Sequence, residues 1–216
     1  MIPIAKSTEP QSLQHYRLQA GAFYDGQNFT PVKQDIRAQL VAEQGYLCAY
    51  CMGRIEPDDR NMKVEHWHSR KKYPGQQLNH ANLLGCCSGN EGQPDAHAHC
   101  DTKKRDDDLL FNPAEPNDRS RLKICYEFNG TMKSEDSEFD RQLNKTLNLN
   151  YSRLKNNRQS VWSSVTKTLS GFPGKASRAQ IEGLLLIWQQ KNREGKLPEY
   201  CGVAQYYLEK KLKRTL

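Results

Sequence analysis

The sequence predicts an α+β protein in which a small metal-stapled region is followed by a β-hairpin and a mostly helical C-terminal part. Five of the seven cysteines fall within residues 48–100, a density that favours a metal site. Residues 121–128 alternate between apolar and polar side chains and end in Asn129-Gly130, the strongest short hairpin signal. Beyond residue 137, apolar residues recur at helical spacing. We therefore divide the chain into an N-terminal arm (1–29), a metal-stapled domain (30–112) and a hairpin with a helical region (113–216).

The composition leaves little apolar material for a conventional core. Of the 216 residues, 41 are Leu, Ile, Val or Phe, a fraction just under the ~20% at which disorder becomes a concern. The net charge of +7 is modest, so charge repulsion alone does not keep the chain open. We expect residues 30–112 to depend on bound zinc for stability, and the apolar stripes of a conventional core to lie mainly beyond residue 137.

The sequence also excludes some classes of protein. No apolar run reaches the ~18 residues that indicate a transmembrane helix. The first residues, Met1 to Lys6, lack a basic segment followed by an apolar stretch, so no signal peptide is predicted. We expect a cytoplasmic protein with no membrane partner.

The first regular element is expected to follow the arm. Residues 1–29 are weakly patterned and rich in Gln, and we expect them to be extended. Thr30 and Pro31 read as an N-cap and a first helical residue. Apolar residues follow at helical spacing, and Gly45 is a C-terminal stop signal. A helix of about four turns should therefore deliver the chain to the first cysteines.

The cysteine pattern predicts a structural zinc site rather than disulfides. Seven is an odd number, and a reducing cytoplasm disfavours disulfides. Cys48-Ala49-Tyr50-Cys51 is a Cys-x-x-Cys pair, which aims two thiolates at one point and supplies half of a tetrahedral site. The other half must come from a downstream group of candidates: Cys86, Cys87, Cys100, His97 and His99. Cys125, in a predicted strand, and Cys201, in a predicted C-terminal loop, are expected to be small apolar residues.

Short elements are predicted between the two halves of the zinc site. Residues 56–61 form a loop, 63–68 a strand, and 78–87 a second element. A basic loop with Arg70, Lys71 and Lys72 lies between them. A polar loop over 88–98 then precedes a short helix from 99 to about 107.

The C-terminal part is predicted to be helical after the hairpin returns over 131–134. One helix should start near 137 and break around 148–151, and two more should span about 177–194 and 203–214. Residues 151–216 carry a net charge of +9, from 13 Lys and Arg against 4 Asp and Glu, so residues 1–150 carry −2. A solvated helical face is the more ordinary reading of this charge, and a phosphate-tracking surface is the alternative.

Several short motifs together resemble a known family. They occur in the order Cys48-Ala49-Tyr50-Cys51, Val64-Glu65-His66-Trp67, Asn82-Leu83-Leu84, Cys87 and Cys100-Asp101-Thr102-Lys103-Lys104. This order resembles the zinc-stapled branch of the HNH endonucleases, whose nuclease core has the ββα-metal fold. The resemblance covers about residues 30–112. Later segments, such as Leu109-Leu110-Phe111-Asn112-Pro113, resemble the PtuB group of that family, the HNH subunits of Septu and retron-associated anti-phage systems, and extend the likeness to about residue 160.

The resemblance implies a metal-dependent endonuclease that hydrolyses phosphodiester bonds of DNA or RNA, including tRNA. His66 matches the general base, and Glu65 matches an acidic ligand of Mg²⁺ or Mn²⁺. Asp101 stands where the family usually has Asn or His as the second metal ligand. Asn82 matches the residue that ties the connecting loop and orients the histidine. Lys104 is expected to contact phosphate or the backbone, and Arg70, Lys71 and Lys72 are further candidates for contacts with phosphate or nucleic acid.

The resemblance also implies a zinc site and partners. Cys48, Cys51, Cys87 and Cys100 are the implied ligands, although twelve residues separate the last two where the family usually has a close pair. Cys87 is preferred to Cys86 because it falls five residues after Asn82. The implied partners are the nucleic-acid substrate and a PtuA-like ATPase subunit in a hetero-oligomer, with a retron reverse transcriptase and its RNA and DNA as further candidates.

Some alternatives stay open at the sequence level. Strict strand alternation would place Glu65 and His66 on opposite faces, so both can serve one site only where the strand ends or twists. His68 has the same strand parity as His66 and is the rival base. His97 or His99 could replace a cysteine at the zinc site. The alternative function is a non-catalytic subunit, either a zinc-stabilised nucleic-acid-binding module or an adaptor that docks onto the ATPase.

Overall fold

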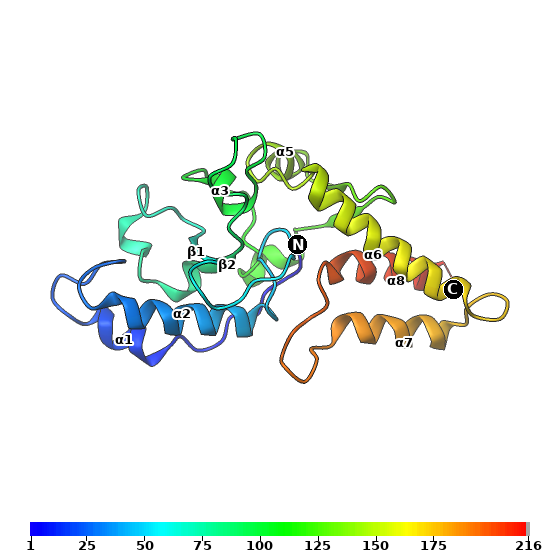
Figure 1. Ribbon diagram of the computed structural model, residues 1–216, viewed down its shortest axis with the longest axis horizontal. Coiled ribbons are helices and arrows are strands. Elements are labelled where there is room, and N and C mark those ends of the chain that lie inside the picture. Colours follow the sequence, from blue (N-terminus) through cyan, green and yellow to red (C-terminus); the bar gives the residue numbers. More distant parts are fainter. Residues whose placement is uncertain (215–216) are drawn as a thin grey trace.

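The computed structural model describes residues 1–214 and has mixed helices and small sheets, which confirms the α+β class. Figure 1 shows the arrangement of these elements. The elements are α1 (Gln11–Arg17), α2 (Phe29–Glu43), β1 (Lys63–His66), η1 (Pro74–Gln76), η2 (His80–Asn82), β2 (Leu83–Cys86), α3 (Cys100–Lys104), α4 (Pro116–Arg119), β3 (Ile124–Tyr126), β4 (Met132–Ser134), α5 (Ser137–Lys145), α6 (Ser152–Ser170), α7 (Arg178–Gln189) and α8 (Cys201–Lys213). Within the described chain, every helix is too short or too polar to cross a lipid bilayer.

The N-terminal segment is not the extended arm that its weak pattern predicts. Helix α1 packs against α2, and its apolar residues Leu13 and Tyr16 are buried. Met1 is buried as well, and its amino group donates a hydrogen bond to Tyr126 Oη at 2.9 Å. Lys6 forms an ion pair of 2.7 Å with the buried Glu43 at the end of α2. The segment is therefore part of the core rather than an appendage.

Helix α2 carries the chain to the first cysteine turn, as predicted, but it starts two residues earlier than predicted. Asn28 occupies the N-cap with a φ of 61°, and Thr30 lies inside the helix. The helix ends before Gly45, whose φ of +59° reverses the chain. A Cβ at Gly45 would lie 2.7 Å from Leu197 Cγ, so both backbone conformation and close packing require glycine there.

Strands β1 and β2 form a two-stranded antiparallel sheet in which Glu65 pairs with Leu84 and His66 with Leu83. The predicted strand over 63–68 ends at His66, and the second predicted element contains the turn η2 before β2. Helix α3 follows after the polar loop and stops at Lys104, three residues before the predicted end.

The predicted hairpin is confirmed by β3 and β4, which pair antiparallel around Asn129-Gly130. Gly130 has a φ of +78°, and a Cβ there would lie 2.0 Å from the carbonyl oxygen of Lys155 in α6. The hairpin turn therefore packs directly on the backbone of α6. The turn needs glycine for its conformation and for this contact.

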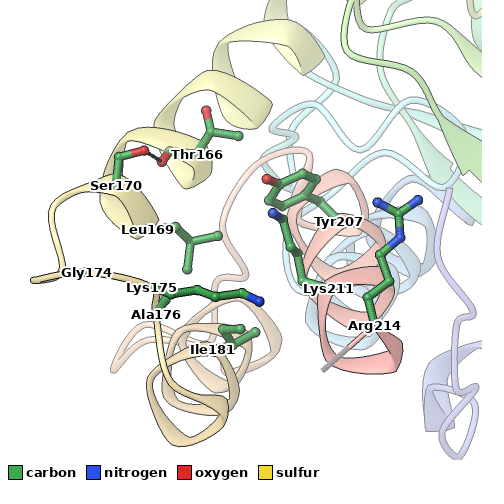
Figure 2. Close-up of a pocket in the computed structure, with 10 residues that line it drawn as sticks. All are labelled: Thr166, Leu169, Ser170, Gly174, Lys175, Ala176, Ile181, Tyr207, Lys211 and Arg214. Carbon is green, nitrogen blue, oxygen red and sulfur yellow. Dashed lines mark hydrogen bonds between the residues drawn. The ribbon is translucent and has the colours of Figure 1, made fainter. Parts of the chain in front are cut away.

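The C-terminal part is helical, as predicted, and the expected break lies between α5 and α6. Helix α7 ends at Gln189, earlier than predicted. Cys201, expected in a loop, is the fully buried first residue of α8. Helices α6, α7 and α8 pack together at one end of the molecule (Figure 1), and a pocket of about 420 Å³ lies between them (Figure 2).

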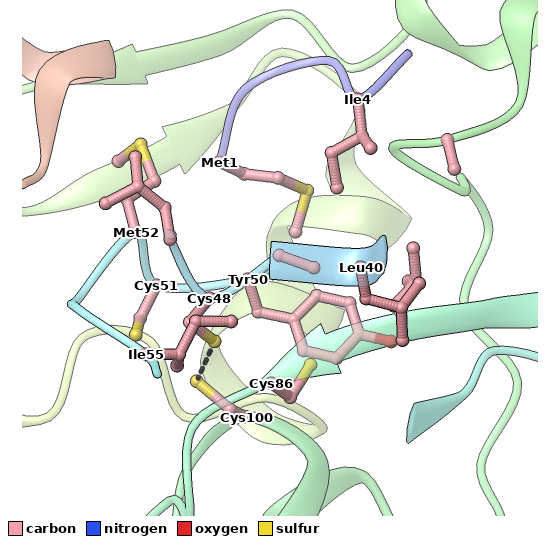
Figure 3. Packing of buried hydrophobic residues seen from close by; sticks show 14 of the residues in the cluster. Met1, Ile4, Leu40, Cys48, Tyr50, Cys51, Met52, Ile55, Cys86 and Cys100 are labelled. Carbon is pink, nitrogen blue, oxygen red and sulfur yellow. Dashed lines mark hydrogen bonds between the residues drawn. The ribbon is translucent and has the colours of Figure 1, made fainter. Parts of the chain in front are cut away.

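The main core is built mostly from residues 1–154, with Tyr200, Cys201 and Val203 added from the start of α8, which corrects the expectation that the conventional core lies mainly beyond residue 137. Figure 3 shows apolar side chains such as Met1, Ile4, Leu40 and Ile55 packed around the cysteines. The C-terminal helices contribute a second, small cluster of Val165, Ile181, Ala204 and Leu208. The extent of this core was missed because, outside helices such as α2, many of its residues come from turns and very short elements, which leave no periodic pattern in the sequence.

Candidate active site and metal centre

The first pair of cysteines lies on a tight turn after α2. The Cys48 amide donates to the Gly53 carbonyl at 2.9 Å, and the Met52 amide donates to the Cys48 carbonyl at 3.0 Å. The Gly53 amide points at Cys51 Sγ at 3.4 Å. Met52 has a φ of 66°, which closes the turn. The turn therefore presents both thiols on one side and gives one of them an N–H donor.

The structure brings four cysteine sulfurs together: those of Cys48, Cys51, Cys87 and Cys100, all within 4.8 Å of one another. The Sγ atoms of Cys48 and Cys100 are 3.8 Å apart, as are those of Cys51 and Cys87. Four Zn–S bonds of about 2.3 Å in a tetrahedron separate the sulfurs by about 3.8 Å. The group could therefore hold a zinc ion, and its donor set and spacing both fit that metal.

The second pair meets because the intervening loop is folded back on itself. The His99 amide donates to the Gly89 carbonyl at 3.0 Å, and Gly89 has a φ of +58°. Asn148, between α5 and α6, donates its side-chain amide to the carbonyls of Ala96 and Ala98. Cys100 itself has a φ of 54° and donates its amide to the Leu147 carbonyl at 2.9 Å. The long separation in sequence is thus closed by contacts outside the cysteine motifs.

The other candidate ligands lie outside this group of four. Cys86 Sγ is buried in the core beside Tyr50 (Figure 3). His99 Nδ1 lies 3.2 Å from Cys100 Sγ and 4.0 Å from Cys87 Sγ, so the ring borders the cluster. His97 is exposed, with its ring 5.7 Å from that of Tyr151.

Glu65, near the end of β1, is held by two buried groups. Its Oε1 accepts a hydrogen bond of 2.9 Å from Tyr50 Oη and forms an ion pair of 2.8 Å with Lys104 Nζ. Burial and then the neighbouring Asp101 carboxyl raise the pKa of Glu65 well above its ordinary value, against the charge of Lys104. Two carboxyl groups this close repel when both are ionised, and a bound divalent cation would relieve that repulsion.

An open pocket of about 370 Å³ collects most of the predicted catalytic residues. Glu65, His66 and Asp101 line it, and cations lie around them: Arg70, Lys71 and Arg105. One or two carboxylates with open positions for water and phosphate are what Mg²⁺ usually takes in proteins. The donor set of Glu65 and Asp101 therefore fits a magnesium ion with substrate.

His66 lies at the last position of β1 with its ring fixed on both sides. Its Nε2 lies 3.0 Å from the Gln77 carbonyl oxygen, so Nε2 carries the proton and Nδ1 is left with a lone pair. The Tyr24 ring packs edge-on at 4.5 Å between centroids. Burial lowers the pKa of His66 to about 4, so the ring is neutral at cellular pH.

Asn82 ties together the loop that follows β1. Its Oδ1 accepts from the His68 amide at 2.7 Å, and its Nδ2 donates to the carbonyls of His68 and Gln76 at 3.0 and 3.2 Å. Its own carbonyl accepts from the Trp67 amide. These bonds end the strand directly after His66 and set the path of the chain to Gln77. Because the strand ends there, Glu65 and His66 can line the same pocket despite strand alternation.

Lys104 and Lys72 lie away from the lining of this pocket. Lys104 is fully buried, and its Nζ also donates to the His66 carbonyl at 3.3 Å, so of its two predicted contacts it makes the one with the backbone and it supports Glu65. Lys72 lies outside the pocket lining and pairs with Asp108 at 3.2 Å. Arg70 and Lys71 do line the pocket, together with Arg105 from the end of α3, which sequence reasoning missed.

His68 lies in a different pocket from Glu65. It lines a separate cavity of about 330 Å³ with Trp67 and Asn82, and its ring packs against Trp67 and Tyr73. Sequence reasoning also missed Tyr50 and Gln77, which hold the side chains of Glu65 and His66. Tyr50 lies inside the Cys-x-x-Cys turn, so its position between two ligands was the available signal. Gln77 acts through its backbone, for which the sequence carries no signal.

Comparison with known proteins supports the resemblance seen in the motifs. No family model matches the chain. Over 104 residues it is 29% identical to the Septu protein PtuB of Bacillus thuringiensis, covering 48% of this chain and 37% of that protein. Over 132 residues it is 26% identical to the "Retron Vc95 putative HNH endonuclease" of Vibrio cholerae serotype O1 biovar El Tor, covering 57% and 62%. Each match spans less than two thirds of the relative's length. The chain resembles HNH-like proteins of the PtuB kind.

Proposed function

We propose that this chain is a metal-dependent HNH endonuclease that hydrolyses phosphodiester bonds of DNA or RNA, including tRNA. The observation that carries the proposal is the pocket in which Glu65, His66 and Asp101 meet under a rim of cations. In this reading β1, β2 and α3 form a ββα-metal core, and zinc on Cys48, Cys51, Cys87 and Cys100 staples it. The Vibrio cholerae relative is named as a putative HNH endonuclease, which supports the same activity.

The histidine is suited to accept a proton from water. Its Nε2–H is donated to the Gln77 carbonyl, which fixes the tautomer and leaves Nδ1 as the base. Because its low pKa keeps the ring neutral, the lone pair is available across the physiological pH range. Water is the nucleophile, so no 2′-hydroxyl is needed and both DNA and RNA can be cleaved, leaving 5′-phosphate and 3′-hydroxyl ends.

The carboxylates are suited to hold a metal beside the histidine. A Mg²⁺ or Mn²⁺ ion on Glu65 and Asp101 would stabilise negative charge on the leaving 3′ oxygen. Tyr50 and Lys104 hold Glu65 in place, and the rim residues Arg70 and Lys71, with Arg105, would neutralise the substrate phosphates.

We further propose a role in anti-phage defence. The relatives are named as a Septu protein and a retron protein, which supports an effector subunit controlled by a PtuA-like ATPase in a hetero-oligomer. A retron reverse transcriptase with its RNA and DNA is a further proposed partner. We propose the cytoplasm as its location and residues 30–112 as the nuclease domain.

The test is Mg²⁺-dependent cleavage of labelled DNA and RNA, with and without the ATPase partner. His66→Ala should abolish cleavage, and His68→Ala is the matched control because it lines a different pocket. Equal zinc content in all samples shows that the staple is intact. If His66→Ala cleaves as fast as the wild type and His68→Ala does not, the base is misassigned. If the wild type binds nucleic acid or the ATPase but never cleaves, the non-catalytic alternative holds.

A further inference from the structure

A pocket between the C-terminal helices lies far along the chain from the proposed active site. It is formed by α6, the loop after α6, α7 and α8, and has a volume of about 420 Å³. Its lining residues are Thr166, Leu169, Ser170, Gly174, Lys175, Ala176, Ile181, Tyr207, Lys211 and Arg214. These helices form one end of the molecule, while β1 and β2 lie in the other half (Figure 1).

The charge of this pocket is of one sign. Lys175, Lys211 and Arg214 line it, and none of its described lining residues is acidic. Figure 2 shows Lys175 extending from the loop toward α8, where Lys211 lies, with Arg214 at the outer edge. The surrounding residues 151–216 carry a net charge of +9. A concave site with cations of one sign concentrates anions from solution.

The other lining residues restrict further which class of ligand fits the pocket. Leu169, Ile181 and Tyr207 give it an apolar and aromatic wall. The hydroxyl groups of Thr166 and Ser170 are already engaged, since Ser170 Oγ donates to the Thr166 carbonyl at 3.0 Å and Thr166 Oγ1 donates to the Ser163 carbonyl at 2.9 Å. The remaining polar groups that a ligand would meet are the Tyr207 hydroxyl group and the three cations. A matching ligand carries phosphate-like charge next to a flat apolar group.

We propose that this pocket binds one nucleotide unit of a nucleic-acid strand. Its phosphate would lie on Lys175 and Lys211, a neighbouring phosphate on Arg214, and its base against Leu169 and Tyr207. The volume falls in the range of about 300–1,000 Å³ that small-ligand sites occupy. The inference extends the proposed function, because the strand is the substrate held away from the point of cleavage. The pocket therefore contributes to affinity and not to the chemical step.

The experiment measures binding of a fluorescent 20-nucleotide single strand, DNA and RNA in turn, by anisotropy. All proteins are full-length and carry His66→Ala, so that cleavage does not interfere. The pocket pair Lys175→Glu/Lys211→Glu is compared with Lys167→Glu/Lys213→Glu. The control lysines are exposed, lie outside the lining on α6 and α8, and change the net charge by the same amount.

We expect the substitutions of the pocket pair to raise the Kd at least tenfold, and those of the control pair to raise it less than threefold. The dependence of log Kd on log salt should also become shallower by about 1.4 for two lost phosphate contacts. If both pairs weaken binding equally, the effect is long-range charge and the proposal is wrong. If the glutamate pair unfolds, Lys175→Gln/Lys211→Gln is compared with Lys167→Gln/Lys213→Gln, and equal affinities again overturn the proposal.

Two further arms identify the source of the phosphate. If AMP binding depends on the pocket lysines and strand binding does not, the ligand is a free nucleotide and the proposal fails. The same holds if only vesicles of phosphatidylserine and phosphatidylcholine depend on them. If the strand binds through the pocket but the wild type does not cleave it, the proposed endonuclease activity is wrong and the proposed binding site stands. If the wild type cleaves nucleic acid but the two pairs of variants bind the strand equally, the binding site is wrong and the endonuclease activity stands.

Discussion

Replacing Lys104 by Met should destabilise the protein more than any change to its exposed lysines. The Lys104 side chain is 0% exposed and its partner Glu65 only 4%, with 2.8 Å between Nζ and Oε1. Removing the cation leaves the Glu65 carboxyl buried beside Asp101 with Tyr50 as its remaining donor. Breaking a buried pair from one side costs about 3–5 kcal/mol, which for a chain of this size is a fall in Tm of about 6–20 °C.

The matched control is Lys103→Met, one residue earlier on α3. Lys103 pairs with Asp95, whose side chain is 57% exposed, and such a pair contributes about 0–1 kcal/mol. Thermal melting of both variants at equal zinc content is the assay. Because the stranded carboxylate is costly only when ionised, the deficit of Lys104→Met should grow from pH 6 to pH 8.5. Adding Glu65→Gln should recover part of the loss. Equal melting temperatures for the two lysine variants would refute the reasoning.

Other predictions address the metal centre, the hairpin and acid stability. Cys87→Ser should lose the bound zinc while Cys86→Ser keeps one ion per chain, measured by mass spectrometry of metal content; the reverse result would exchange their roles. Gly130→Ala should lower the free energy of unfolding in urea by several kcal/mol, because the new Cβ would overlap a backbone carbonyl. Gly183→Ala is the control, since its Cβ would meet open space on a helix, and it should raise the free energy of unfolding by up to about 1 kcal/mol. Similar effects of the two substitutions would contradict the packing described. Burial, and after it the charge of Lys6, lowers the pKa of His80 to about 4. Below a pH of about 6.5 the unfolded chain therefore binds a proton at this residue that the folded chain does not bind, and the stability of the fold decreases as the pH falls. From pH 7.5 to 5.0, His80→Gln should therefore lose about 1–2 kcal/mol less than the wild type in the same assay, and an equal loss would contradict this sign.

Local signals in the sequence predicted the elements with strong chemistry of their own. The turn residues Asn129-Gly130 located the hairpin, and the apolar spacing after residue 137 located the helices and their break. The Cys-x-x-Cys pair identified the turn that carries two sulfurs of the cluster. In each case a few neighbouring residues determine the backbone, so the prediction needs no knowledge of distant contacts.

The parts that were missed depend on contacts between distant segments. Met1 and Leu13 are buried because they pack on other segments of the chain. The weak pattern of their own segment does not predict this burial. Lys104 was assigned to phosphate or the backbone from its place in the motif, and its ion pair with the buried carboxyl group of Glu65 was not predicted. The fixed tautomer of His66 depends on the carbonyl of Gln77, which any residue could supply. The motifs therefore predicted which residues lie together in the pocket, and they did not predict the contacts that hold those residues in place.

The most direct test of the central claim is an end-group analysis of nucleic acid after incubation with the protein and Mg²⁺, in the presence of the proposed PtuA-like ATPase partner. A metal-dependent hydrolysis in the pocket of Glu65, His66 and Asp101 predicts fragments with 5′-phosphate and 3′-hydroxyl ends. These fragments should be absent with His66→Ala at unchanged zinc content. The same fragments in equal yield from His66→Ala would contradict the assignment of this pocket as the site of cleavage.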